Sequence, residues 1–309
     1  MYMKKNIISL AILLICGLSL MAQDFSAEMV RAERENDTVR QAQILAQWEK
    51  QNPNDPALYY YYFDYYYSLA WNSDEILTTE KPVNKRYYEV PDSTGKVVAY
   101  LTQGDVNKDY LAKAMEKIDK GINMFPNYLD LRLDKLYALC VDLKDWDKAE
   151  AEILKAVEYS TIINNKWYPQ SMEVNEEMFL SYIVSFENMI FSCVGSELYS
   201  EKESEQLALR TRKIAESVLG YYPKSVDNVN IIGATYFALK DYDKALETFK
   251  KAEAMSPENA VVLLNMAVAY EEKGDKDNAI KYCNKLIDNP NTRKSSRETA
   301  EQILKRLTK

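Results

Sequence analysis

The chain has 309 residues, with 39 Lys and Arg against 47 Asp and Glu, a net charge of −8 and no histidine. Without histidine, the chain cannot form a Ser-His-Asp triad or a His-ligated zinc or non-haem iron site. The acidic balance also lacks the basic surface that nucleic-acid binding requires, so we expect no nucleic-acid partner. The 47% of hydrophobic residues predicts a folded chain with a buried core.

The first 22 residues are typical of a secretory signal peptide. Lys4 and Lys5 precede an apolar run from Ile7 to Met21, and the small residue Ala22 follows as a suitable cleavage position. The run is shorter than the about 20 apolar residues that span a bilayer, which disfavours a membrane anchor as the alternative. We therefore predict cleavage near Ala22 and a mature chain, residues 23–309, that has no membrane span and forms a single domain.

The cysteines favour neither a lipid anchor nor a disulfide framework. Cys16 lies in the leader, but the bulky Ile15 precedes it where lipoprotein signals have a small residue. The cysteines of the mature chain are scattered and lack the paired spacing of a metal site, so we interpret Cys140, Cys193 and Cys283 as buried apolar side chains. We expect an exported protein of the periplasm or cell envelope, with an outer-membrane lipoprotein as the alternative.

Amphipathic helices are predicted for the first part of the mature chain. Residues 25–51 form one helix at the N-terminal end. A second begins after Pro53 and Pro56, and its core positions follow the i, i+3, i+4 spacing of a buried face: Tyr59, Tyr62, Phe63 and Tyr66. Its partner has core positions Ala114, Ile118 and Gly121. An insertion therefore splits this helix pair.

The insertion is predicted to contain a β-hairpin at about residues 80–104. Residues 86–90 and 96–101 are rich in strand-forming residues, and the turn sequence 91–95 joins them. An isolated hairpin is marginal in water, so we expect it to pack on the helices of this chain. The alternative is an edge strand that accepts an extended peptide.

Two further helix pairs are predicted before residue 226. Residues 127–160 form one pair, in which Leu133 and Leu136 are core positions of the first helix. Residues 174–193 and 201–221 form the next, after a longer loop at 162–173.

Residues 226–259 and 260–293 form an internal repeat. When the two segments are aligned, similar residues recur 34 positions apart. The matched pairs are Gly233 with Ala267, Tyr236 with Tyr270, Asp241 with Asp275, Asp243 with Asp277, Ala245 with Ala279 and Phe249 with Cys283.

This order of residues resembles the tetratricopeptide repeat (TPR), in which small, aromatic and closing Pro residues recur at fixed spacing. The first copy matches throughout: Gly233, Tyr236, Ala245, Phe249, Ala252 and Pro257. The second departs at Leu286 and at Pro290, which comes one place early. The resemblance implies an all-α fold, a TPR-like α-solenoid of antiparallel helix pairs with one inserted β-hairpin and a C-terminal capping helix at 295–308.

The paired acids of the repeat are interpreted as helix caps. Asp241 and Asp243 precede the second helix, where a carboxylate accepts hydrogen bonds from free N–H groups. A calcium loop starting at Asp241 would need Gly at its sixth place and Glu at its twelfth, where the chain has Leu246 and Ala252. We predict no metal site and no cofactor.

The resemblance also implies a partner-binding groove lined by the first helix of each pair. The candidate groove residues are Tyr60, Asp64, Tyr67, Asp134, Asn230, Phe237, Asn265 and Glu271. Their mixture of aromatic rings, amides and carboxylates favours a polar or basic extended ligand. For the tyrosines, the alternative is core packing against the inserted hairpin.

Three classes of function follow from these features. The favoured one is a non-enzymatic scaffold of the cell envelope that binds a protein or peptide in the groove. The alternative is a surface glycan-binding component that uses exposed tyrosines. An enzyme is disfavoured, because the sequence has no phosphate-binding loop, dinucleotide glycine pattern or nucleophile elbow.

Overall fold

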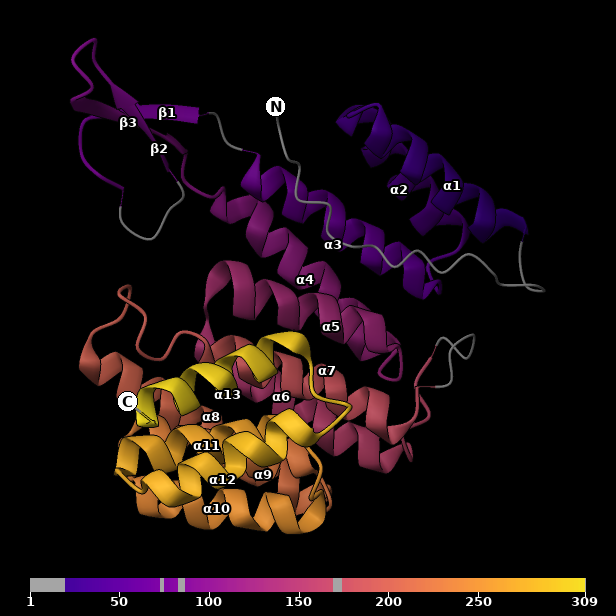
Figure 1. Cartoon of the computed structure of the whole chain (residues 1–309). Coiled ribbons are helices and arrows are strands. Elements are labelled where there is room, and N and C mark those ends of the chain that lie inside the picture. Colours follow the sequence, from indigo (N-terminus) through magenta and orange to yellow (C-terminus); the bar gives the residue numbers. More distant parts are fainter. Residues whose placement is uncertain (1–19, 73–74, 83–86, 169–173, 309) are drawn as a thin grey trace. The chain divides into compact units, whose positions relative to one another are not determined.

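The computed structural model of the chain describes residues 20–72, 75–82, 87–168 and 174–308 (Figure 1). Most of the predicted leader lies outside these residues. Within them the chain forms thirteen α-helices, one π-helical turn and three strands. The fold class predicted from the repeat is confirmed: an all-α, TPR-like solenoid of antiparallel helix pairs with one small inserted sheet. Among the described helices, none has the length and apolar character needed to cross a bilayer.

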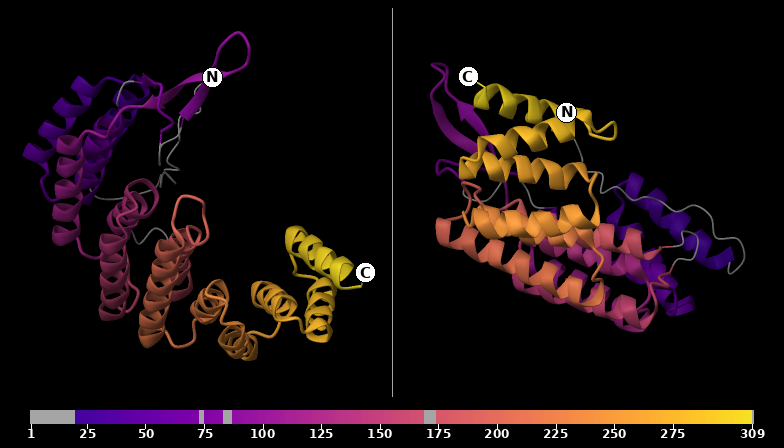
Figure 2. Two further views of the ribbon diagram at one scale, coloured as in Figure 1. Left: turned by 90° about the vertical axis from the view of Figure 1, so that its left-hand side faces the viewer. Right: turned by 60° about the horizontal axis from the view of Figure 1, so that its bottom comes forward.

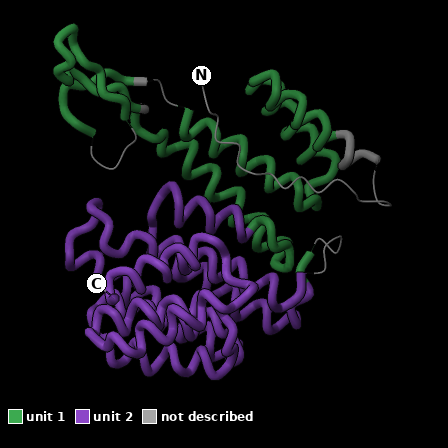
Figure 3. Tube along the Cα trace, viewed as in Figure 1, with its two compact units in different colours: residues 1–131, 167–173 green, residues 132–166, 174–309 purple. Residues whose placement is uncertain are grey.

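Internal contacts divide the chain into two compact units (Figure 3). Unit 1 comprises residues 1–131 and 167–173, and unit 2 comprises residues 132–166 and 174–309. The single domain expected for the mature chain stays a prediction, and each unit is described by itself below.

Unit 1 begins with two helices where the sequence predicted one. The helices α1 (Leu20–Arg34) and α2 (Thr38–Gln51) are separated by a turn in which Asn36 has a left-handed backbone, with φ of 53°. Asp37 caps α2, because its carboxylate accepts a hydrogen bond from the Arg40 N–H at 2.9 Å. The prediction of one helix over 25–51 is therefore wrong, since the apolar spacing continues across this cap.

The aromatic helix α3 (Pro56–Trp71) packs against α4 (Lys108–Met124), the partner predicted on the far side of the insertion. Gly121 permits a close crossing, because a Cβ at this position would lie 2.6 Å from the Cβ of Tyr59. Tyr59 and Ile118 are buried at the contact. The insertion therefore leaves the helix pair intact.

The insertion forms a three-stranded antiparallel sheet and not a hairpin alone. The strands β2 (Tyr87–Pro91) and β3 (Val97–Gln103) are the two that the sequence predicted, and β1 (Glu75–Thr78) pairs with the other edge of β3. In the turn between β2 and β3, the Asp92 carboxylate accepts the N–H groups of Thr94 and Lys96, and Gly95 has a φ of 84°. The four residues of β1 give too short an alternation to be recognised in the sequence.

The sheet differs from its prediction in how it packs. Its strands make their extensive contacts with one another and not with the described helices of unit 1. Leu77 and Tyr88, which lie opposite Leu101 on the two sides of β3, are 66% and 75% exposed. Because β3 pairs with a strand on each of its edges, cross-strand pairing replaces the expected packing on helices.

Unit 2 contains the remaining helix pairs. The helix α5 (Leu129–Tyr137) begins in unit 1 and continues into a π-helical turn (Ala138–Leu143), after which α6 (Trp146–Ile162) follows. The next pair is α7 (Glu176–Phe191) and α8 (Glu201–Tyr221). Successive helices of this unit pack side by side (Figure 2).

The 34-residue repeat corresponds to two helix pairs at the C-terminal end of unit 2. These are α9 (Val226–Ala238) with α10 (Tyr242–Met255), and α11 (Ala260–Lys273) with α12 (Lys276–Asp288); α13 (Lys294–Leu307) follows. A Cβ at Gly233 would lie 2.4 Å from Cε1 of Phe249, so only Gly permits this crossing. Asp241 and Asp275 cap α10 and α12 by accepting N–H groups at 3.2 Å, as predicted.

Candidate functional site

The predicted site residues of unit 1 lie on α3, but they do not share one environment. Tyr67 is 7% exposed and stacks on Phe63 with 5.0 Å between ring centroids, so it is a core residue and not a groove residue. Tyr66, predicted in the core, is half-buried and stacks on Tyr110 of α4. The template assigned these two faces incorrectly because α3 is aromatic around its whole circumference, which removes the polar stripe that normally identifies the outer face.

Asp64 lies next to a second acid that the sequence analysis missed, Glu33 on α1. Both side chains are partly exposed. Burial raises the pKa of Asp64, and burial together with the nearby Asp64 carboxylate raises the pKa of Glu33 to about 7. In the described part of the chain, neither acid has a hydrogen-bond or ion-pair partner. The two acids therefore form a small acidic centre to which the described residues supply no cation.

Aromatic rings lie beside this acidic centre. Tyr60 meets Tyr61 edge to face, with 5.1 Å between centroids. Burial and the charges of Glu33 and Asp64 raise the pKa of Tyr61 to about 12, and Ser26 of α1 hydrogen-bonds its hydroxyl. These four residues, Glu33, Tyr60, Tyr61 and Asp64, are named the acid–tyrosine site below.

The rings of the acid–tyrosine site have rigid support. The ring centroids of Tyr61 and Trp48 of α2 lie 5.6 Å apart, and those of Trp48 and Phe25, which are stacked, lie 5.4 Å apart. The Trp48 indole N–H donates to the Asp55 carboxylate at 3.2 Å, and Asp55 also caps α3 through the Ala57 N–H at 3.0 Å. The helices α1, α2 and α3 therefore fix the positions of the aromatic rings, which favours a preformed site.

Glu49, another acid of unit 1, differs from Glu33 and Asp64 because the chain itself supplies its cationic partner. Its carboxylate accepts a hydrogen bond from Lys117 at 3.2 Å and from the Tyr62 hydroxyl at 2.7 Å. These bonds and the charges of Lys117 and Lys120 outweigh burial and lower the pKa of Glu49. At the acid–tyrosine site the pKa values of Glu33 and Asp64 are raised instead, because burial is not offset there by a cation from the described residues.

The predicted site residues of unit 2 mostly have partners within the chain. The Asn265 amide donates to the Asn230 carbonyl oxygen at 2.9 Å, which joins α9 to α11. The Glu271 carboxylate accepts two hydrogen bonds from Arg306 of α13, at 2.9 and 2.8 Å. Phe237 lies against Tyr242, and Asp134 is half-buried on α5. These contacts link neighbouring helices and leave little polar capacity for a ligand.

The acids and thiols of the chain do not gather into a metal centre within the described residues. Across residues 20–308, apart from the three gaps, no group of three or more Cys, Asp or Glu side chains is placed to hold a metal ion. Cys140 and Cys283 are buried, and burial raises their pKa values to about 12 and about 11, so both thiols stay protonated near neutral pH.

Comparisons with known proteins match a family model and one curated protein over short parts of the chain. A family model described as regulator of microtubule dynamics protein 1-3 matches residues 231–309. A probable UDP-N-acetylglucosamine–peptide N-acetylglucosaminyltransferase, SEC of Arabidopsis thaliana, is 42% identical over 60 residues. That match spans 19% of this chain and 6% of the plant protein.

Solved structures also match, and two of them are described here. TTC0263, a thermophilic TPR protein of Thermus thermophilus, is 12% identical over 64% of this chain and 92% of its own, with a TM-score of 0.41. PilW, a type IV pilus biogenesis factor, is 13% identical over 92% of this chain and 100% of its own, with a TM-score of 0.42.

Proposed function

We propose that the protein is a non-enzymatic scaffold that binds a partner protein or peptide, and that the acid–tyrosine site of unit 1 takes a basic side chain of that partner. The observation that carries the proposal is the pair Glu33 and Asp64, two partly desolvated acids beside an aromatic surface, with no cation from the described residues. An arginine or lysine side chain would supply the charge, and its stem would pack on the rings of Tyr60 and Tyr61.

The pKa of Glu33 gives the site a specific pH dependence. With a pKa of about 7, Glu33 is only partly ionised at neutral pH. A bound cation favours the ionised form, so binding releases a proton and strengthens as the pH rises through this range. Affinity for a basic ligand should therefore increase between about pH 6 and pH 8, where neither an arginine side chain nor an ordinary carboxylate titrates.

A matched pair of peptides tests this proposal. The first is the capped pentapeptide acetyl-Gly-Gly-Arg-Gly-Gly-amide, and the second has citrulline, the neutral isostere of arginine, at its centre. Calorimetric titration of the purified mature protein should show saturable binding of the arginine peptide only. Equal binding of the citrulline peptide would contradict a cation site.

Two variants complete the design. Asp64→Asn should weaken arginine-peptide binding by about tenfold and raise the thermal midpoint, because it removes a partly desolvated charge that has no cationic partner among the described residues. Glu49→Gln is the control, since Glu49 already has its cation, and it should leave binding unchanged. Undiminished binding by Asp64→Asn would place the peptide elsewhere on the chain.

We further propose that the scaffold acts in the cell envelope after cleavage of its leader. Lys4, Lys5 and the apolar run that ends before Gln23 support this location. The absence of a phosphate loop or nucleophile elbow from the sequence supports a non-enzymatic role. Intact-mass measurement of the fractionated protein checks the location: a mass that retains residues before Gln23, or an added acyl group on Cys16, would contradict it.

A further inference from the structure

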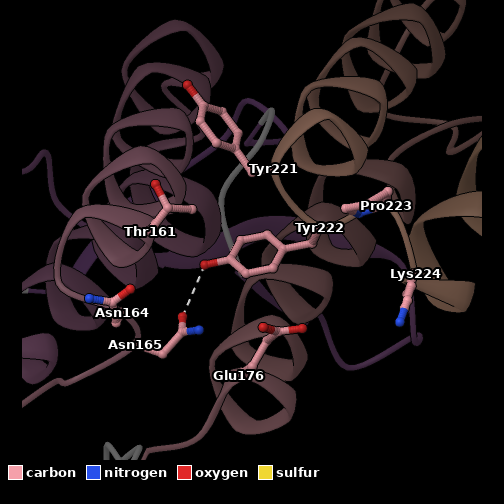
Figure 4. A pocket seen from close by; sticks show the side chains of 8 residues that line it. All are labelled: Thr161, Asn164, Asn165, Glu176, Tyr221, Tyr222, Pro223 and Lys224. Atoms are coloured by element: carbon pink, nitrogen blue, oxygen red, sulfur yellow. Dashed lines mark hydrogen bonds between the residues drawn. The ribbon is translucent and has the colours of Figure 1, made fainter.

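A pocket of about 340 Å³ lies in unit 2, and none of the predicted groove residues lines it (Figure 4). The turn after α6 provides one wall with Asn164 and Asn165, and the end of α8 provides another with Tyr221 and Lys224. Glu176, the first residue of α7, also lines it. The volume falls at the lower end of the range of about 300 to 1,000 Å³ that is usual for small-molecule sites.

Asn165 is held so that its amide nitrogen is available to a ligand. Its carbonyl oxygen accepts a hydrogen bond from the Tyr222 hydroxyl at 3.0 Å (Figure 4). It also accepts one from the Ser160 hydroxyl at 2.5 Å. Tyr222 is 5% exposed, so this side of the amide is anchored in the core. The amide N–H groups have no hydrogen-bond partner in the described part of the chain. The side chain therefore presents two fixed donors.

The backbone of this wall is unusual as well. Asn164 and Asn165 both have left-handed conformations, with φ of 50° and 58°. Asn adopts such conformations more readily than most other residues, and they end α6 here. Here the two conformations place consecutive amide side chains at the same pocket.

The charges of the pocket balance one another. Glu176 and Lys224 contribute opposite charges, and neither forms an ion pair within the described residues. A lone anion would be attracted by one group and repelled by the other, and so would a lone cation. A neutral ligand that both donates and accepts hydrogen bonds can use the carboxylate and the ammonium together.

The wall at the end of α8 also offers an apolar surface. Tyr221, the last residue of α8, is 46% exposed. A flat ring beside side-chain amides and a carboxylate suits a ligand with one apolar face and a hydroxyl-bearing rim. Saccharide rings have this combination, because their C–H bonds gather on one face while their hydroxyl groups donate and accept.

We propose that this pocket binds a neutral saccharide unit. The Asn165 amide donates to a sugar hydroxyl, the Glu176 carboxylate accepts one, and the Tyr221 ring packs against the C–H face. The site is separate from the acid–tyrosine site, and it would give the scaffold a second type of ligand.

Titration of the purified mature protein with single sugars tests the proposal. The methyl glycosides of glucose, galactose, mannose and N-acetylglucosamine are the probes, followed by saturation-transfer NMR and calorimetry up to about 50 mM, where weak single-ring binding is detectable. At least one should bind saturably. Absence of saturable binding by all four would overturn the proposal, and so would binding of a zwitterionic amino acid such as glycine in their place.

Variants tie the binding to this pocket. Tyr221→Ala should weaken the sugar that binds by at least about tenfold. Asn165→Asp keeps the oxygen that Ser160 and Tyr222 use but removes both donors, so it should lose binding while circular dichroism stays that of the parent. Tyr88→Ala, which removes an exposed tyrosine of the sheet, is the control and should bind like the parent. Parent-like binding by Tyr221→Ala would overturn the assignment.

Discussion

Glu187→Gln should change how the stability of the protein depends on pH. Glu187 lies on α7 with no exposed surface, and both of its carboxylate oxygens accept from the Asn228 amide nitrogen, at 2.9 and 2.8 Å. The Asn228 oxygen in turn accepts from the Ser225 hydroxyl at 2.6 Å. Burial raises the pKa of Glu187 to about 8, the nearby Asp227 adds to the rise, and the Asn228 hydrogen bond partly offsets it.

The sign of the effect follows from the proton count. Between the ordinary pKa of 4.5 and the folded-state value of about 8, the native protein holds a proton on Glu187 that the unfolded chain has released. The contribution of Glu187 to stability is therefore complete below about pH 4.5, declines as the pH rises, and levels off above about pH 8. At 1.36 kcal/mol per pKa unit, the total decline is on the order of 5 kcal/mol.

Urea melts of the parent and of Glu187→Gln, measured at intervals from about pH 5 to pH 9, test this reasoning. Glutamine keeps the shape and the amide contact but cannot ionise, so the variant should gain on the parent steadily as the pH rises. Glu49→Gln is the control: the pKa of Glu49 is lowered, so its stabilisation is lost only as the pH falls through the acid range. A parent-to-Glu187→Gln difference that stays constant with pH would refute the argument.

Three further changes test the packing. Gly233→Ala places a Cβ 2.4 Å from a phenyl ring, so urea melts should show a free energy of unfolding that is about 1 to 3 kcal/mol lower. Gly220→Ala is the control: its Cβ has nothing within 4 Å, so the change should be neutral or stabilise the helix by up to about 1 kcal/mol. Tyr67→Ala should cost about 3 kcal/mol or more, because the ring is buried, and the half-buried Tyr60→Ala should cost less; equal thermal midpoints would contradict the burial. Asp55→Ala removes a helix cap and the acceptor of a buried indole, so it should cost about 2 kcal/mol by circular dichroism melts.

The helix pairs could be predicted because their signals are local. The close helix crossing at Gly233 requires a small residue at a fixed sequence separation from the bulky residue that it contacts. Asp241, four residues before Ala245, caps the free N–H groups at the start of α10. Both requirements recur in each copy of the repeat and therefore appear as a spacing in the sequence. The break at Asn36 left no such signal, because a left-handed residue and a cap interrupt the helix without interrupting its apolar pattern.

The candidate site could be predicted only in part. Tyr60 and Asp64 were found because the repeat template assigns positions on α3. Their neighbour Glu33 lies on another helix, and nothing local marks it as a partner of Asp64. The same holds for the pocket of unit 2, where Asn165 and Tyr222 meet although 57 residues separate them in the chain. Contacts between helices that are distant in sequence depend on tertiary packing, which no periodicity encodes.

The acids that are wholly or partly buried differ in which group stabilises them, and this difference separates structural from binding roles. Glu49 has a lysine of its own chain, so its charge is already stabilised. Glu187 accepts hydrogen bonds from the Asn228 amide and has no exposed surface, so no ligand can reach it. It avoids the free-energy cost of a buried negative charge by keeping its proton. Glu33 and Asp64 are raised in pKa as well, but they remain partly exposed, lie beside each other and have no partner among the described residues. A cation from outside can therefore reach them and relieve both the desolvation and the mutual repulsion. That gain is available only on binding, which is why these two acids, and not the more deeply buried one, define the candidate site.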